Sequence, residues 1–289
     1  MYERQDAKLA ANTLFRELPF MTMNITLGQA ALYADSYDPS MLGPIPRSHS
    51  RVGLWGEKGL PFSGKDIWTC YELSWLDASG KPQVAIGEFE FSFNSYAIIE
   101  SKSFKYYLNS FNQTRYKSWQ HVSNILKHDL SQACGGTVEV SLFKLGNAQA
   151  LQQLPGFCVD DLVLEKPCYS PDARLLKLAG AEKENAQLFS HLLKSNCPVT
   201  GQPDWASVWL EYSGLEILGE SFLAYIVSFR QHQDFHENCV EKIFTDILKQ
   251  CSPRSLSVYA RYTRRGGLDI NPFRSNCRSD VPFNRVARQ

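Results

Sequence analysis

Cys197 is the residue of this sequence best placed for nucleophilic chemistry. It stands in the segment SNCPVTGQPDW, residues 195–205, whose prolines and glycine predict a rigid loop. Asp204 follows seven residues later, so that a carboxyl group near the thiol could deliver or take a proton. The alternative is structural, because most cysteines are buried and inert and an aspartate often belongs to a turn. The residue types by themselves allow both interpretations.

A second candidate group is Phe235-His236-Glu237, at the predicted start of a helix. A glutamate there is favoured by the helix dipole, so a plain capping role would explain it. The functional interpretation is that the Glu237 carboxylate accepts hydrogen bonds from a pair of N–H groups such as a purine presents, since charge-assisted bonds of that kind are strong and selective.

Two further clusters could bind an anion. The segment ESKSFK, residues 100–105, holds one carboxylate, two hydroxyls and two lysines where a strand passes into a helix. The segment RRGG, residues 264–267, combines two guanidinium groups with backbone that permits close approach. Lysines and helix N–H groups are suited to phosphate. A solvated helix start is the alternative for the first cluster.

Several familiar motifs are missing from the sequence. It has no G-x-G-x-x-G, because Gly53, Gly56 and Gly59 have the wrong spacing, and no P-loop or H-E-x-x-H. His236 and Cys239 together with Cys197 do not complete a tetrahedral ligand set at a familiar spacing. We therefore predict no metal site.

A repeat positions these groups. Residues 103–113 (SFKYYLNSFNQ) and 221–231 (SFLAYIVSFRQ) match at six of eleven positions, and the same offset of 118 residues continues for about thirty more. The hydrophobic positions are shared, whereas the polar ones are not, and Leu218 stands where the first copy has Glu100. We predict two modules, residues 1–147 and 148–289, with one composite site per chain at a junction between modules or subunits.

Hydrophobic periodicity predicts the same order of elements in both modules. In the first, strands at residues 67–76 and 84–93 precede a helix after Glu100, a helix at 118–133 and a strand at 137–143. In the second, strands at 188–193 and 205–212 precede helices at 220–231 and 237–251 and a strand at 256–262. Residues 157–164 could add a strand. This order indicates an α+β fold rather than a βαβ alternation.

Composition excludes some classes of protein. The 289 residues carry 30 basic and 30 acidic side chains, so no global field favours nucleic acid or an anionic membrane. No apolar run reaches the roughly 18 residues of a membrane span, and the first 30 residues do not have the pattern of a secretory signal. The eight cysteines form no C-x-x-C pair, which favours reduced thiols in the cytoplasm.

Four motifs occur in order along the chain: residues 100–113, 195–205, 235–239 (FHENC) and 262–276 (YTRRGGLDINPFRSN). Together they closely resemble the NADPH-dependent 7-cyano-7-deazaguanine reductases, the nitrile reductases of queuosine biosynthesis. The resemblance implies the long form of that family, with tandem tunnelling-fold modules. It further implies antiparallel sheets with paired helices on one face, a barrel completed by oligomerisation, and a homodimer.

The resemblance also implies roles for single residues. Cys197 would add to the nitrile carbon as a thiolate and give a covalent thioimide, Asp204 would protonate the nitrogen, and two NADPH molecules in succession would reduce it to an aminomethyl group. The substrate 7-cyano-7-deazaguanine would be bound by Glu100, Ser101, Lys102, His236 and Glu237. The cofactor would be bound by Lys102, Ser103, Arg265 and Gly266.

Two other functions stay open at this point. A thiol hydrolase or cyclohydrolase acting on a purine or pterin would use Cys197 with His236 as its base, or a metal. A non-catalytic purine-binding module would leave Cys197 as a spectator, because a fold does not fix a function.

Overall fold

The computed structural model describes residue 34 and residues 36–52, 54, 59–147 and 150–289. The prediction that the first 30 residues are no secretory signal lies outside these residues. Residues 34–289 form a compact unit, and the description below is of that unit. No helix in this part of the chain is long and apolar enough to cross a membrane.

The first half of the unit begins with short elements and continues with a long hairpin. The short elements are the 3₁₀ turns η1 (Pro39–Met41) and η2 (Arg47–His49) and the strand β1 (Pro44–Pro46), which pairs with β4 (Ala97–Ile99). The hairpin joins β2 (Ser63–Leu76) to β3 (Pro82–Ser92). Helices α1 (Ser101–Asn109) and α2 (Trp119–Cys134) follow, and then strand β5 (Val138–Phe143) and turn η3 (Leu145–Asn147).

The second half repeats this order after a crossover connection. The connection holds β6 (Leu151–Gln152), β7 (Phe157–Cys158) and η4 (Ala173–Leu175). The repeated elements are β8 (Leu178–Asn196), β9 (Pro203–Ile217), α3 (Gly219–Ser228), η5 (Phe229–Gln231), α4 (His236–Cys251) and β10 (Ser255–Tyr262). They are followed by β11 (Leu268–Ser275) and β12 (Arg285–Val286), of which β12 pairs with β6.

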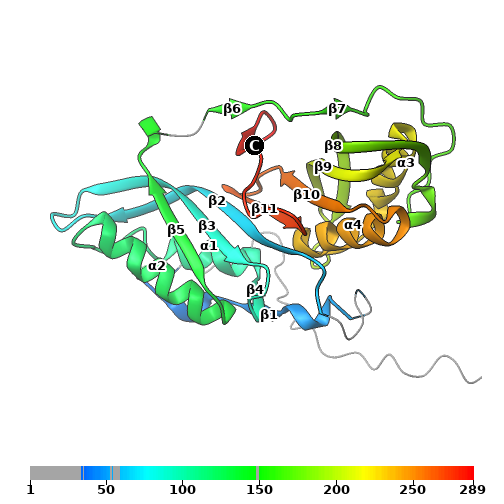
Figure 1. The fold of residues 1–289 in the computed structure, drawn as a ribbon. Coiled ribbons are helices and arrows are strands. Elements are labelled where there is room, and N and C mark those ends of the chain that lie inside the picture. The colour runs from blue at the N-terminus through cyan, green and yellow to red at the C-terminus, as the bar shows by residue number, and fades with distance from the viewer. Residues whose placement is uncertain (1–33, 35, 53, 55–58, 148–149) are drawn as a thin grey trace, which may run out of the picture. The chain divides into compact units, whose positions relative to one another are not determined.

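One eight-stranded sheet joins the two halves, with the strand order β5-β3-β2-β11-β10-β9-β8-β7 (Figure 1). All its pairs are antiparallel except that of β7 with β8. The β2–β11 pair crosses from one half to the other, from Leu268 opposite Cys70 to Ser275 opposite Ser63. The predicted α+β fold is therefore confirmed, and the two halves share a continuous backbone ladder.

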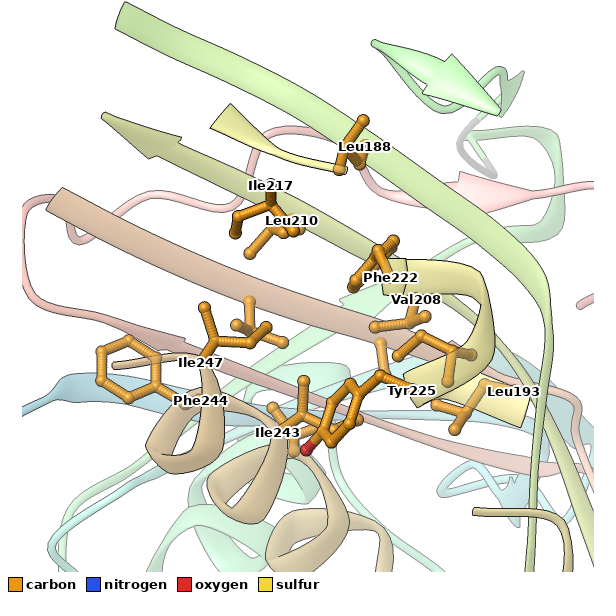
Figure 2. Packing of buried hydrophobic residues seen from close by; sticks show 14 of the residues in the cluster. Leu188, Leu193, Val208, Leu210, Ile217, Phe222, Tyr225, Ile243, Phe244 and Ile247 are labelled. Atoms are coloured by element: carbon orange, nitrogen blue, oxygen red, sulfur yellow. The ribbon is translucent and has the colours of Figure 1, made fainter. Parts of the chain in front are cut away.

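The helices cover one face of the sheet. In β3 the side chains of Phe89 and Phe91 are buried while those of Glu88 and Glu90 are only partly so, as the alternation predicts. Figure 2 shows the equivalent packing in the second half, where Phe222 and Tyr225 of α3 and Ile243, Phe244 and Ile247 of α4 pack against Val208 and Leu210 of β9. A smaller cluster contains Trp209, the residue between those two, together with Tyr259 and Phe273. Burial of each such side chain contributes about 1.5–3 kcal/mol.

The repeat extends to the contacts that begin the helices. In the first half Glu100 N donates to Gly43 O at 2.8 Å, and Gly43 N donates to Ser103 Oγ at 2.9 Å. In the second half Leu218 N donates to Lys177 O at 3.0 Å, and Lys177 N donates to Ser221 Oγ at 3.0 Å. The hydroxyls of Ser103 and Ser221 therefore accept equivalent backbone hydrogen bonds at the starts of α1 and α3.

Two predictions about local structure need correction, and one strand was not predicted. The segment 195–205 is not wholly a loop, because β8 runs to Asn196 and β9 starts at Pro203, which leaves only residues 197–202 between them. Of residues 157–164, only Phe157 and Cys158 form a strand. Strand β11 was not predicted, since Pro272 interrupts its short alternation of apolar and polar residues, and its polar residues are buried as well. The division at residue 147 stays a prediction.

Candidate active site

A pocket lies where α1, α4, the β8–β9 loop and β11 approach one another. Residues from both halves line it, and they include seven of the ten residues predicted to act in catalysis or binding. The lining consists of Trp68, Ile98, Ile99, Glu100, Ser101, Cys197, Pro198, Asp204, Asp234, Phe235, His236, Glu237, Arg265 and Ile270. The predicted residues outside it are Lys102, Ser103 and Gly266.

Cys197 is the first residue of the tight loop between β8 and β9. Its amide donates to Gln202 O at 2.9 Å, and its carbonyl accepts from Gly201 N at 2.9 Å. Gly201 has φ +68°, a conformation that favours glycine and closes the loop. These contacts fix the backbone that carries the half-buried thiol at the pocket wall.

The surroundings of the Cys197 thiol favour the thiolate. Partial burial by itself would raise the pKa, but hydrogen bonds from the hydroxyl and amide of Thr200, the amide of Val199 and the guanidinium of Arg265 outweigh it. The pKa of Cys197 is therefore lower than that of an ordinary cysteine. The thiolate is the nucleophilic form of cysteine, so this environment suits covalent chemistry.

Asp204 lies between the guanidinium of Arg265 and the ring of His236. Its side chain is 3% exposed, with Oδ1 3.0 Å from Arg265 Nε and Oδ2 3.2 Å from His236 Nε2. The His236 ring is stacked on Tyr262, with ring centroids 3.8 Å apart and planes 7° apart. His236 Nδ1 is buried without a hydrogen-bond partner among the described residues. The Asp204 carboxyl group and the His236 ring are thus in contact, and both line the pocket that contains the Cys197 thiol.

Glu237 is a buried carboxyl group without a full set of partners. It is 2% exposed, and its Oε1 has no hydrogen-bond partner in the described part of the chain. Burial, and next the nearby charge of Asp66, raise its pKa to about 8. Since a buried polar atom without a partner costs free energy, the arrangement indicates that a ligand provides the partner. The capping interpretation does not account for a carboxyl oxygen that bonds nothing.

A buried network of ion pairs lies next to Glu237 along α4. Glu241, one helical turn later, pairs with Arg51 at 2.6 Å and with Arg274 at 2.8 Å. Arg274 also pairs with Asp66 at 2.8 Å, and Asp66 pairs with Arg47 at 2.5 Å. The network joins the segment before β2, strands β2 and β11, and helix α4, so it fixes the helix that carries Glu237. No sequence pattern indicates this network, since its members lie far apart along the chain.

Glu100 connects the first half of the chain to the pocket. It is the N-cap of α1, and its Oε1 and Oε2 accept from Lys102 N at 2.9 Å and Ser103 N at 2.7 Å. The Ser103 hydroxyl accepts a hydrogen bond from Gly43 N and donates one to Glu100 O at 2.7 Å, so it is both an acceptor and a donor within the fold. The Lys102 ammonium lies 5.9 Å from the centre of the Tyr106 ring.

A basic edge beside the pocket fits an anionic cofactor. Lys105 is partly buried, and this burial, and next the nearby charge of Arg265, lower its pKa. A Cβ added to Gly266 would lie 3.3 Å from Lys105 Nζ, and Gly266 has φ +56°, so glycine lets the backbone lie close to this lysine. Cationic side chains next to open backbone suit phosphate groups. No individual role was predicted for Lys105. Its spacing of three residues from Lys102 could have indicated one, because residues three apart lie on the same face of a helix.

Comparison with known proteins agrees with this site. Residues 33–142 match the family model described as nitrile reductase, 7-cyano-7-deazaguanine-reductase N-term, and residues 203–281 match the model described as QueF-like protein. The NADPH-dependent 7-cyano-7-deazaguanine reductase of Saccharophagus degradans is 62% identical over 92% of this chain and 99% of its own length. This chain belongs to the 7-cyano-7-deazaguanine reductase family.

Other relatives in the family are similar over the same extent. The reductases of Teredinibacter turnerae and Bordetella pertussis are 56% and 51% identical, covering 91% and 92% of this chain and 97% and 98% of their own lengths. The structure of the archaeosine synthase QueF-Like in its apo form covers 34% of the chain and 95% of its own with a TM-score of 0.30, a similarity too small to inform the fold. The family predicted from the four sequence motifs is confirmed, and the chain is an oxidoreductase.

Proposed function

We propose that this chain reduces the nitrile of 7-cyano-7-deazaguanine to the aminomethyl group of 7-aminomethyl-7-deazaguanine, with two NADPH molecules, in cytoplasmic queuosine biosynthesis. The observation that supports this best is one pocket holding a thiol of lowered pKa, a buried acid and an unpaired carboxyl group. Its relatives are NADPH-dependent reductases of this base by name.

Recognition of the base rests on Glu237. A deazaguanine presents a ring N–H and an amino N–H side by side, and a carboxylate accepts both with good geometry. Glu237 Oε1 is free for such a bond, and the network that includes Glu241 fixes its helix. Glu100, Ser101 and His236 line the same pocket and complete the proposed contacts, together with Lys102 at its margin.

The first chemical step is addition of the Cys197 thiolate to the nitrile carbon. One C–S bond forms, one π bond of the nitrile breaks, and the nitrogen takes a proton to give a thioimide. Asp204 is the proposed proton donor, and His236, at 3.2 Å from it, can return a proton to it. Splitting a difficult reduction into an addition and later transfers is the general benefit of covalent catalysis.

When bound, NADPH would supply a hydride twice, once to the thioimide and once to the imine that remains after the thiolate leaves, and the imine nitrogen would take a second proton to give the amine. The residues proposed to hold it are Lys102, Ser103, Arg265 and Gly266, and the structure adds Lys105 to this edge. The hydroxyl of Ser103 is used inside the fold, so we propose that it positions the start of α1 rather than bonding the cofactor.

The assembly implied by the family is a homodimer of tunnelling-fold modules. Among the described residues β5 pairs only with β3, which leaves one edge of the eight-stranded sheet available. An edge of this kind is either covered or paired in natural proteins. We propose that this edge of β5 pairs with a second subunit and so closes the barrel.

The test is a spectrophotometric assay of NADPH oxidation with the nitrile base and the full chain. The proposal predicts two NADPH consumed per amine formed, and no oxidation with Cys197→Ala. Hydrolysis of a purine or pterin without NADPH oxidation would instead favour a thiol hydrolase. Unchanged binding of the base by Cys197→Ala, with no turnover by the wild-type chain, would favour a binding module.

A further inference from the structure

A second cluster of reactive side chains lies at the far edge of the sheet. Cys158 on β7, Asp160 just after it and His191 on β8 each place one ligand atom within 4.8 Å of the others. All three side chains are half-buried, so the group is neither sealed in the core nor fully solvated. None of them lines the pocket that holds Cys197.

The backbone of β8 is irregular at this cluster. Ser190 lies opposite Val208 and Leu193 opposite Ala206, which leaves His191 and Leu192 facing Ser207 alone in a β-bulge. Bulges redirect side chains and occur often beside functional sites. His191 Nδ1 lies 2.7 Å from the buried hydroxyl of Ser207, which fixes the ring and leaves Nε2 with no partner among the described residues. A histidine ligand is usually held in this way through its second nitrogen.

The carboxylate of Asp160 is oriented by the same bulge. Its Oδ1 accepts from Ser190 Oγ at 2.6 Å, and its Oδ2 accepts from His191 N at 2.9 Å. Each oxygen keeps a lone pair for a further partner, because a carboxylate has about four acceptor positions.

We propose that Cys158, Asp160 and His191 bind a zinc ion, with water at the fourth position. Sulfur, imidazole nitrogen and carboxylate oxygen are the three donor types that zinc takes in proteins, at bond lengths of about 2.0–2.3 Å. Ligand atoms on a tetrahedral ion of that size lie roughly 3.3–3.8 Å apart, so separations of up to 4.8 Å need to contract by at most about 1–1.5 Å. Hard ions such as Mg²⁺ do not favour a thiolate.

The site would fasten the crossover connection to the sheet. This connection joins the two halves, and β7 contributes only the pairs Phe157–Leu188 and Cys158–Phe189 to the ladder. A metal bridging Cys158 and His191 adds a strong link between β7 and β8. If no metal binds, the role of Asp160 is only to accept a hydrogen bond from the backbone amide of His191, which lies in the bulge.

The experiment is a Co²⁺ titration of the full chain carrying Cys197→Ala, so that the catalytic thiol adds no signal. Thiolate-bound Co²⁺ absorbs in the near ultraviolet, and tetrahedral Co²⁺ gives strong visible bands. One equivalent should bind and be displaced by Zn²⁺. Cys158→Ser should abolish the ultraviolet band and His191→Ala should remove the visible bands, whereas Cys168→Ser, in the same connection but outside the cluster, should change neither. Ser207→Ala should weaken binding about 10–100-fold.

Two results would overturn the zinc site: no Co²⁺ or Zn²⁺ bound at stoichiometric concentration, or a charge-transfer band that survives Cys158→Ser. Folding is checked separately, since Cys158→Ser in the otherwise wild-type chain should keep its nitrile-dependent NADPH oxidation. Zn²⁺ should raise the melting temperature of the wild-type chain but not that of Cys158→Ser. An equal rise in both proteins would also contradict the assignment.

Discussion

Glu237 makes substrate affinity depend on pH in a direction that the structure fixes. The carboxyl is buried with one oxygen unpartnered, and its pKa is about 8 instead of 4.5. Ionising it in the free protein therefore costs on the order of 5 kcal/mol more than in water. If the base binds through the carboxylate, only the ionised fraction of the protein is competent, and binding below pH 8 releases a proton.

The expected magnitude follows from that fraction. With a pKa of about 8, roughly one molecule in ten is ionised at pH 7 and one in a hundred at pH 6. The measured dissociation constant of the base should then be about 10-fold weaker at pH 7, and about 100-fold weaker at pH 6, than above pH 9. Binding is measured calorimetrically with Cys197→Ala, so that covalent addition does not contribute.

The matched control is the double variant Cys197→Ala, Glu237→Gln. Glutamine has the shape of glutamate but no ionisable group. We therefore expect this variant to bind the base more weakly and without this part of the pH dependence. A dissociation constant that is flat between pH 6 and 9 with Glu237 present would refute the argument. An equal slope in both variants would refute it as well.

Four further predictions follow from the same contacts. Glu237→Gln should raise the free energy of unfolding at pH 9 but not at pH 4, because the unfolded chain loses the proton near 4.5 and the folded chain near 8; urea titrations that show equal effects at both pH values would contradict this. Arg265→Gln should move the midpoint of Cys197 alkylation by iodoacetamide to higher pH, since a hydrogen bond to the thiolate is lost; an unmoved midpoint would exclude that bond. Arg274→Met should destabilise by about 3–5 kcal/mol in urea titrations, because two buried carboxylates each lose a cationic partner, whereas Arg254→Met at an exposed pair should change stability little in the same assay. Ser103→Ala and its repeat partner Ser221→Ala should lose similar stability, about 1–3 kcal/mol, with the KM for NADPH unchanged in both; a raised KM in Ser103→Ala alone would show a direct cofactor contact.

The repeat explains why much of the fold is readable from the sequence. Helix and strand periodicities are local, and two copies at one offset confirm each other, so β2, β3, α1, α2 and β5 have counterparts in β8, β9, α3, α4 and β10. Strand β11 escapes prediction because Asp269, Asn271 and Arg274 are buried by tertiary partners that no local pattern reveals. The β8–β9 hairpin is longer than predicted because polar residues in β8 are tolerated on its exposed part.

The candidate site was also predictable only in part from the sequence. Cys197, Asp204, His236 and Glu237 were predicted to act together from their types and motifs, and the pocket contains all four. Their electrostatics could not be predicted, because the pKa of Glu237 depends on Asp66, 171 residues away along the chain. Arg265 was predicted as a cofactor contact, yet within the fold it contacts Gln202, Asp204 and the Cys197 thiol.

The central claim is a transient bond between Cys197 and the nitrile carbon, and intact-protein mass spectrometry tests it most directly. The full chain is mixed with 7-cyano-7-deazaguanine in the absence of NADPH, and the mass is measured before and after NADPH is added. The account predicts one added equivalent of the base, located on the peptide that contains residue 197, absent in Cys197→Ala and discharged by NADPH. An adduct of equal mass on Cys197→Ala, or turnover by that variant, would contradict it.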